Sequence, residues 1–300
     1  MRISDGDQIR IFDSYIHPET LSAGCCDHND GILAVGASNL WIQGNVVAYG
    51  ESNIEVEGGS AVIVTGNFLL NPRDEQGGTG PRGGNFQCWS QTPTSAGCTN
   101  VTVENNYALS SMDTAKYLYS ENTQDSINFG HTDGIVARNN YITGGHSGFG
   151  CGLIADLGAN SAQFLNNVLV DTGQCGIGIA DGTNQLVDGN LVINRTPVAG
   201  SGNQAIYVWQ GYGAAGACGP VMVSNNVAVQ LKPDGIVSGF WKGAGCDPLT
   251  LSGNVFGQPA YDLLMPVEQV LPPPPIPPQP KDCVVRSPYS TQTAVAGCGP

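Results

Sequence analysis

Two aspartates stand at the ends of similar apolar segments and are the first candidates for catalytic residues in this sequence. Asp156 ends the segment GLIAD, and Asp181 ends the segment GIGIAD. If these segments form neighbouring strands, the two carboxyl groups lie near the separation of about 5–5.5 Å used by retaining glycosidases, in which one is the acid and the other the nucleophile. Like charges at that distance raise the pKa of one group, as a general acid requires. Turn formation at strand ends, or a calcium site, would place aspartates at the same positions.

Further acid and histidine candidates lie in the segments around this pair. Glu121 ends KYLYSE and is the expected counterpart on the preceding strand. His28 and Asp30 belong to the phrase HNDGI, and His131 opens the similar phrase HTDGI. We expect His131, together with His146 of GHS, to hold substrate or relay a proton near neutral pH. An Asp-Gly pair before an apolar strand is also a common turn signal.

These phrases resemble motifs of a known enzyme group. HNDGI and HTDGI are similar to the NTDG phrase of polygalacturonase-type glycoside hydrolases, and GHS is similar to their GHG phrase. The resemblance implies that Asp30 is a proton donor. The sequence departs from the group's pattern, because Glu51 and Glu55 follow HNDGI where the group has paired aspartates, and no RIK phrase exists.

Aromatic residues suited to stacking on sugar rings accompany the carboxylates, although ordinary packing would also use them. The candidates for substrate binding are the aromatic residues Tyr119, Trp209, Tyr212 and Trp241, together with the carboxylate of Glu121. A lyase would need an outward basic residue, but Arg138 stands beside a predicted turn and Lys116 in a predicted loop. Hydrolysis is therefore favoured over elimination.

A repeated phrase identifies the elements that must position these residues. The phrase alternates apolar and polar residues, continues with Gly or Asn followed by Asn, and ends with two apolar residues. Its eight second-Asn anchors are Asn45, Asn67, Asn106, Asn140, Asn167, Asn190, Asn226 and Asn254. The position three residues before each anchor is apolar throughout, which indicates a strand with one buried face. A ninth copy has Asp13 and Ser14 in place of the Gly/Asn-Asn pair.

Nine such units of at least about 22 residues describe a β-solenoid in which identical positions stack. Asn and Gly suit the sharp turn because they tolerate left-handed backbone conformations. The Asn-rich turns resemble those of the right-handed parallel β-helix proteins of the pectate-lyase-like superfamily. We therefore expect an all-β, single-stranded right-handed parallel β-helix of about nine coils with loop insertions.

Domain boundaries follow from composition. Residues 1–271 should form the β-helix, with 261–271 as a C-terminal cap over the last coil. Residues 272–280, with the sequence PPPPIPPQP, are predicted to form a polyproline spacer. Residues 281–300 are predicted to form a short tail. The first phrase begins without an amphipathic helix before it, so an upstream cap or a partner subunit should cover that end.

The ten cysteines favour an oxidising compartment, since no C-x-x-C pair suggests zinc. Their offsets from the anchors predict two bridges between neighbouring coils, Cys151–Cys175 and Cys218–Cys246. A third bridge, Cys88–Cys98, would close a loop, and Cys283–Cys298 would close the tail. Reduced buried cysteines are the alternative, and Cys25 and Cys26 have no predicted partner.

Composition limits the partners. With 11 basic and 25 acidic residues, the net charge of −14 repels nucleic acid, and no apolar run is long enough to cross a membrane. The sequence therefore predicts an extracellular, periplasmic or virion-associated glycoside hydrolase acting on a polysaccharide, with a lyase less favoured. No cofactor is required, although the carboxylates are suited to Ca²⁺. The alternative is a non-catalytic glycan-binding adhesin or tailspike-like module.

Overall fold

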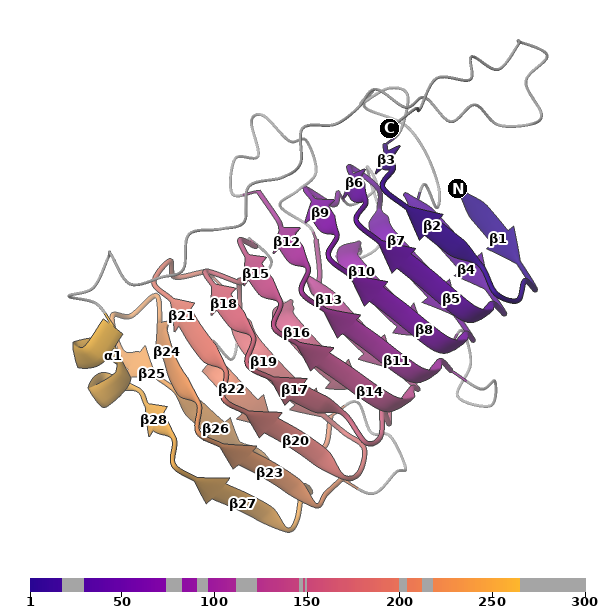
Figure 1. Ribbon diagram of the computed structural model, residues 1–300. Helices are drawn as coiled ribbons and strands as arrows, with labels where there is room; N and C mark the ends of the chain where they lie inside the picture. The colour runs from indigo at the N-terminus through magenta and orange to yellow at the C-terminus, as the bar shows by residue number, and fades with distance from the viewer. Residues whose placement is uncertain are drawn as a thin grey trace.

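The coils stack into three long sheets, as a computed structural model of the chain shows (Figure 1). The structure describes residues 1–17, 30–73, 83–90, 97–111, 123–145, 148, 150–199, 204–211 and 218–264. Sheets A and B each contain nine strands in sequence order, and every neighbouring pair in them is parallel. The chain is therefore a parallel β-helix, and the predicted fold class is confirmed.

Each coil contributes one strand to each sheet. Sheet A comprises β1 (Arg2–Ser4), β4 (Ile32–Val35), β7 (Ser52–Glu57), β10 (Gly84–Trp89), β13 (Ile127–Gly130), β16 (Cys151–Asp156), β19 (Cys175–Ala180), β22 (Gln204–Val208) and β26 (Phe240–Lys242). Sheet B comprises β2 (Arg10–Phe12), β5 (Ser38–Gln43), β8 (Ser60–Thr65), β11 (Thr99–Glu104), β14 (Asp133–Arg138), β17 (Gln163–Leu165), β20 (Gln185–Asp188), β23 (Val221–Ser224) and β27 (Leu249–Ser252).

Sheet C completes each coil and ends against the only helix among the described residues. It comprises β3 (Tyr15–Ile16), β6 (Val46–Ala48), β9 (Phe68–Leu70), β12 (Tyr107–Leu109), β15 (Tyr141–Thr143), β18 (Val168–Val170), β21 (Leu191–Asn194), β24 (Val227–Leu231), the antiparallel β25 (Val237–Ser238) and β28 (Val255–Phe256). Helix α1 (Gln258–Leu264) packs its Ala260 against Ile193 and Val229 on the outer face of sheet C. No helix in the described part of the chain is long and apolar enough to span a membrane.

The predicted Asn anchors stand at the corner between sheets B and C. Each anchor's Nδ2 donates to Oδ1 of the anchor on the next coil, at 2.9 to 3.0 Å, from Asn45 to Asn254. The residue before each anchor has a positive φ, for example 68° at Gly44 and 55° at Asn139. The sharp left-handed turn expected from the Gly/Asn-Asn pair is confirmed.

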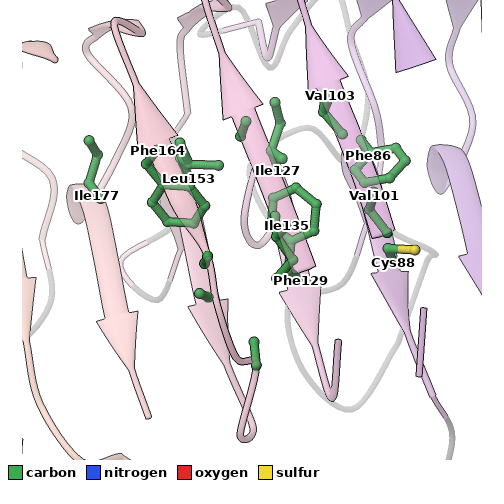
Figure 2. Close-up of a cluster of buried hydrophobic side chains, with 14 of the residues drawn as sticks. Phe86, Cys88, Val101, Val103, Ile127, Phe129, Ile135, Leu153, Phe164 and Ile177 are labelled. Carbon is green, nitrogen blue, oxygen red and sulfur yellow. The ribbon is translucent and has the colours of Figure 1, made fainter. Parts of the chain in front are cut away.

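The interior of the coil is apolar and includes three neighbouring phenylalanines (Figure 2). Phe86 and Phe129 from sheet A and Phe164 from sheet B are completely buried, with ring centroids 5.7 and 6.1 Å apart between successive pairs. Because strand side chains alternate between faces, these inward residues leave their sequence neighbours on the outer face. The outer face of sheet A is thus presented by a rigid, packed wall.

Disulfides join the coils where the sequence predicted. Cys151–Cys175 and Cys218–Cys246 bridge neighbouring coils, with Cα–Cα distances of 4.5 and 4.4 Å, and Cys88–Cys98 closes its loop at 6.0 Å. These three pairings are confirmed. The other four cysteines, Cys25, Cys26, Cys283 and Cys298, lie outside the described residues.

We expect the replacement Asn140→Ala to reduce the free energy of unfolding by about 3 kcal/mol or more, because it removes a buried amide from the ladder. Asn140 Nδ2 donates to Val103 O at 2.9 Å, and Asn140 Oδ1 accepts from Asn106 Nδ2 at 3.0 Å. Chemical denaturation checks this, with the exposed Gln163→Ala as control. Equal losses in the two variants would contradict a stabilising ladder.

Peptide mapping without reduction should recover the three cross-linked pairs Cys88–Cys98, Cys151–Cys175 and Cys218–Cys246, because their Cα separations suit a disulfide. The same digest checks the predicted Cys283–Cys298 bridge. A free thiol at Cys151, Cys175, Cys218 or Cys246 would refute the coil register.

Candidate functional site

A groove of about 500 Å³ lies on the outer face of sheet A. Five carboxylates line it: Asp30, Glu51, Glu55, Glu57 and Asp156. The amides of Gln87, Gln124 and Asn128 and the indole of Trp89 complete most of its polar wall. Among the described residues that line it, Arg2 is the one cation. The groove is therefore acidic and rich in hydrogen-bonding groups.

The strand register aligns these side chains in two rows that run along the solenoid. Glu55 of β7 lies opposite Gln87 of β10, which lies opposite Asn128 of β13. In the second row, Glu57 lies opposite Trp89. Neighbouring strands are about 4.8 Å apart, so the first row presents a polar group at each of three successive steps, from β7 to β13.

Glu55 is held in place by two donors from the next strand. Gln87 Nε2 donates to Oε2 at 2.7 Å, and Trp89 Nε1 donates to Oε1 at 2.9 Å. Both carboxylate oxygens are thereby satisfied although the residue is only 8% exposed. The same bonds fix the indole of Trp89 beside the groove floor, so the platform is formed before any ligand arrives.

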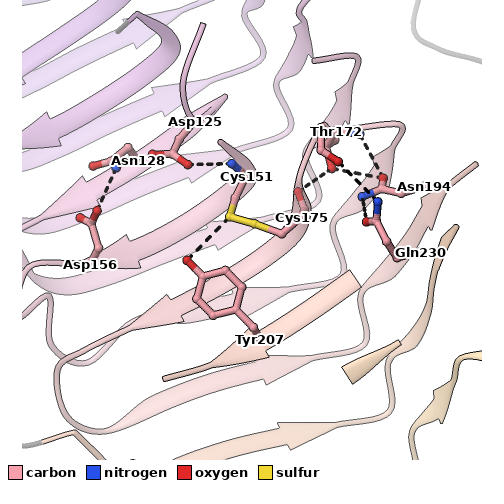
Figure 3. The surroundings of a disulfide bond; sticks show 10 residues. Asp125, Asn128, Cys151, Asp156, Thr172, Cys175, Asn194, Tyr207 and Gln230 are labelled. Atoms are coloured by element: carbon pink, nitrogen blue, oxygen red, sulfur yellow. Dashed lines mark hydrogen bonds between the residues drawn. A yellow bond between two sulfur atoms is a disulfide. The ribbon is translucent and has the colours of Figure 1, made fainter. Parts of the chain in front are cut away.

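Asp156 ends β16 and borders a notch in the groove. The residue is 8% exposed, and its Oδ2 lies 3.5 Å from Asn128 Nδ2 (Figure 3). Its Oδ1 is buried and has no hydrogen-bond partner within the described part of the chain. Gly130 lies opposite Asp156 in the register, and a Cβ at Gly130 would stand 3.3 Å from that Oδ1 and 3.6 Å from Cβ of Trp89. The absence of a side chain at Gly130 leaves the notch between the indole and the carboxyl group.

A second carboxyl group, Asp125, lies behind Asp156. It is 5% exposed, its Oδ1 accepts the Cys151 N–H at 2.7 Å, and its Oδ2 accepts Asn128 Nδ2 at 3.0 Å (Figure 3). The two bonds of Asn128, 3.0 and 3.5 Å long, limit the separation of the two carboxylate oxygens to about 6.5 Å. The sequence alone did not indicate Asp125, because it precedes β13, whereas the predicted carboxylates stand at the ends of strands.

Burial controls the protonation of this pair. Burial, and then the negative charge of Asp125, raise the pKa of Asp156 to about 8, against the opposing bond from Asn128. Burial also raises the pKa of Asp125 to about 6, while the Cys151 N–H and Asn128 lower it. Asp156 is thus protonated at neutral pH beside an ionised neighbour, which is the state that a general acid needs.

The expected stacking of Asp156 on Asp181 was wrong. The register places Ala180 opposite Asp156, as Cys175 stands opposite Cys151, so Asp181 lies one residue beyond the strand. It has a φ of 121°, and its Oδ1 accepts the Gly182 N–H at 2.9 Å. Burial raises the pKa of Asp181, with no contribution from Asp156. Asp181 does not line the groove.

Glu121 is likewise not the counterpart of Asp156, because Gly130 of β13 occupies that position. Asp30 does line the groove, and its Oδ1 accepts the Ser52 N–H at 3.1 Å. His131 stands in the turn between β13 and β14 with a φ of 53° and does not line the groove. Five further candidates lie outside the described residues: His28, Tyr119, Glu121, His146 and Tyr212.

The two predicted tryptophans lie farther along sheet A. Trp209 and Trp241 are 37% and 44% exposed, with ring centroids 6.4 Å apart. Trp241 lies opposite Tyr207, whose ring covers Gly178 and whose hydroxyl lies 3.8 Å from Sγ of Cys151 (Figure 3). The face therefore passes from acidic to aromatic across the Cys151–Cys175 bridge.

Within the described ranges, no group of three or more His, Cys, Asp or Glu residues is arranged to hold a metal ion. The Asp125–Asp156 pair supplies only two such side chains. The geometry at this point suits proton transfer and hydrogen bonding to a polar polymer.

Comparison with known proteins supports the fold. No protein-family model matches the chain, and no curated protein does so. Among solved structures, the chain is similar to the Streptococcus pneumoniae surface protein and adhesin PfbA, with a TM-score of 0.54 and 14% sequence identity. The match covers 75% of this chain and 66% of that chain. At this identity the likeness concerns the fold alone.

Replacing Asp156 by Asn should stabilise the protein in alkali but not in acid. The folded protein holds the Asp156 proton up to about pH 8, whereas the unfolded chain releases it near the usual aspartate pKa of 3.8. Stability is therefore lost as the pH rises from about 4 to about 8. We expect Tm of the variant to exceed that of the wild type by about 3 °C or more at pH 9, and to match it at pH 4.

The control for this measurement is Asp133→Asn, an exposed carboxylate on sheet B, for which thermal denaturation should show no pH-dependent difference. A stabilisation by Asp156→Asn that is the same at both pH values would refute the raised pKa.

Proposed function

We propose that this protein binds a polysaccharide in the groove on sheet A and hydrolyses a glycosidic bond, with Asp156 as the proton donor. The observation that carries the proposal is the position of the Asp156 carboxyl group at the Gly130 notch, with Oδ1 lacking a partner among the described residues. The three disulfides support a location outside the cytosol.

The proposed step uses the groove as a positioning device. A sugar unit would lie against Trp89, and Gln87, Gln124 and Asn128 would bond its hydroxyl groups. The protonated carboxyl of Asp156 would give its proton to the glycosidic oxygen as the bond to the anomeric carbon breaks, and water would supply the new hydroxyl group. Asp125 is a positioning residue, because its charge keeps the proton on Asp156.

The second carboxylate of such a mechanism is not one of the groove glutamates. Glu55 and Glu57 stand on β7, three strands from β16, which is about 14 Å at the usual strand spacing. Inverting glycosidases separate the two groups by about 6.5–9.5 Å. Glu121, which lies outside the described residues, stays a prediction for that role.

Hydrolysis fits this groove better than elimination. A lyase removes a proton next to a carboxylated carbon and needs cations to neutralise that carboxylate. Arg2, on the first strand of the sheet, is the one cation among the described lining residues, against five carboxylates. The groove would therefore repel a uronate substrate.

A second candidate function is glycan binding without cleavage. The distance of about 14 Å from Glu55 and Glu57 to Asp156 favours it, since a binding groove needs no second carboxylate. The similar structure, PfbA, is described as a surface protein and adhesin. On this reading, Asp156 orders the groove and the protein attaches to a surface polysaccharide.

An assay for new reducing ends on a panel of plant, algal and bacterial polysaccharides tests the proposal. Asp156→Asn should lower turnover by about 10²–10⁴-fold while retaining binding, and Asp133→Asn should leave both unchanged.

Unsaturated products, detected by their ultraviolet absorbance, would instead identify a lyase. Saturable binding by the wild type without any cleavage would establish the binding module, and full activity in Asp156→Asn would exclude this residue as the acid.

A further inference from the structure

A second hollow lies on the outer face of sheet B, across its first four strands. Its volume is about 530 Å³, and its lining comes from β2, β5, β8 and β11, which are neighbours in the sheet (Figure 1). Three strand spacings give it a length of about 14 Å. Arg10 is the one charged residue among the described residues that line it. In charge, the hollow is therefore the opposite of the groove on sheet A.

We infer that this hollow binds an acidic sugar, namely a uronate unit of a polysaccharide, whose carboxylate pairs with Arg10. The hollow lies on a different sheet from the groove, so the inference goes beyond the proposed function and does not depend on it. The described lining residues include no carboxylate and no histidine that could transfer a proton. The site would therefore attach the protein to an acidic glycan without cleaving it.

Arg10 is held in position and is available to a ligand. Its guanidinium carbon lies 5.7 Å from the ring centroid of Trp41, the residue opposite it on the next strand. A cation over an indole is attracted to the ring, which orients the arginine side chain. Arg10 is exposed and takes part in none of the ion pairs of the described residues. A planar guanidinium can bind a carboxylate through two parallel hydrogen bonds.

The hollow exists because Ala61 interrupts a row of longer side chains. The register places Ala61 between Asn39 and Asn100 on the neighbouring strands. The three residues have positive φ angles of 51°, 49° and 54°, respectively, a conformation that Asn adopts more readily than Ala. The sequence thus keeps a short side chain at this position against the local backbone preference. Ile63, the next outward residue of the same strand, lines the gap.

The uncharged lining residues favour a sugar over a simple anion. Trp41 and Ile63 are half-buried and leave apolar surface open, against which the C–H face of a sugar ring can pack. The amide of Asn100 and the hydroxyl of Thr102 line the same hollow, and each can donate and accept, as sugar hydroxyl groups require. An inorganic anion would use Arg10 alone.

The negative charge of the protein opposes an anionic ligand, but only weakly at this place. Asp7, on the first coil, does not line the hollow, and its Oδ1 accepts Ser38 Oγ and Asn39 Nδ2, both at 2.7 Å. The net charge of −14 acts mainly through solvent, where charges more than about 8 Å apart are largely screened at physiological ionic strength. Direct contact with Arg10 is therefore the larger effect.

Titration calorimetry with two trisaccharides tests the inference, one of α-1,4-linked galacturonic acid and the other of α-1,4-linked galactose. Their sugar units differ in carrying a carboxylate or a hydroxymethyl group, so the comparison isolates the charge. At about pH 7, where the uronate carboxyl is ionised, we expect the full-length protein to bind the galacturonate at least about tenfold more tightly.

Variants localise the binding. Arg10→Gln should remove the preference for galacturonate, because it deletes the cation. Arg138→Gln is the matched control, since Arg138 lies on the same sheet but is paired with Glu104 at 2.7 Å, and it should leave the affinity unchanged. Ala61→Asn should weaken binding because it fills the gap. Its Tm should not fall, since Asn tolerates the positive φ at this position.

The remaining outcomes decide against the inference without touching the proposed function. Equal affinity for the two trisaccharides, or full galacturonate affinity in Arg10→Gln, would overturn it. A triglutamate peptide that binds as tightly as the galacturonate would overturn it too, because the hollow would then recognise charge alone. Cleavage in the groove on sheet A is measured separately, by new reducing ends and Asp156→Asn, so the two proposals can fail independently.

Discussion

The hydrogen bond between asparagine side chains on successive coils is the interaction on which the rest of the structure depends. Asn67, for example, donates through Nδ2 to Asn106 Oδ1 at 3.0 Å and to Ile42 O on the previous coil at 2.9 Å. One buried amide thus links three coils, and any slip would leave it without partners in an apolar interior. The ladder therefore fixes the stacking of the coils at the corner between sheets B and C, and the stacked coils carry Glu55, Gln87 and Asn128 on neighbouring strands of sheet A.

The fold could be predicted from the sequence because each coil repeats the same local chemistry. The anchors and the apolar residue three positions before them, such as Val64 before Asn67, report a turn and a buried strand face. This signal covers sheets B and C, which flank the turn. It does not determine where α1 packs: Ala260 meets Ile193 and Val229 on the outside of sheet C, a contact that no repeated phrase encodes.

The site was predicted only in part, because it lies on sheet A, which the anchors do not fix. Connections of different length separate each anchor from the next sheet A strand, so Asp156 and Asp181 were compared by their strand ends. The cysteines on the same two strands predict the register correctly. Asp156 is five residues after Cys151, and the residue five after Cys175 is Ala180, so Ala180 and not Asp181 lies opposite Asp156. Asp125 and Gly130 were not predicted as site residues for another reason. Their roles depend on contacts between strands, which no sequence motif reports.

A stacked sheet that places carboxylates at successive steps must relieve the repulsion among them, and two of them do so differently. Glu55 is satisfied by two side-chain donors, Gln87 and Trp89. Asp156 keeps its proton instead, because it is buried beside Asp125 and has only one distant donor. Asp156 thus presents a proton donor to the groove at neutral pH and not a negative charge. This property follows from its place in the register, on the strand next to β13, whose Asn128 also holds Asp125.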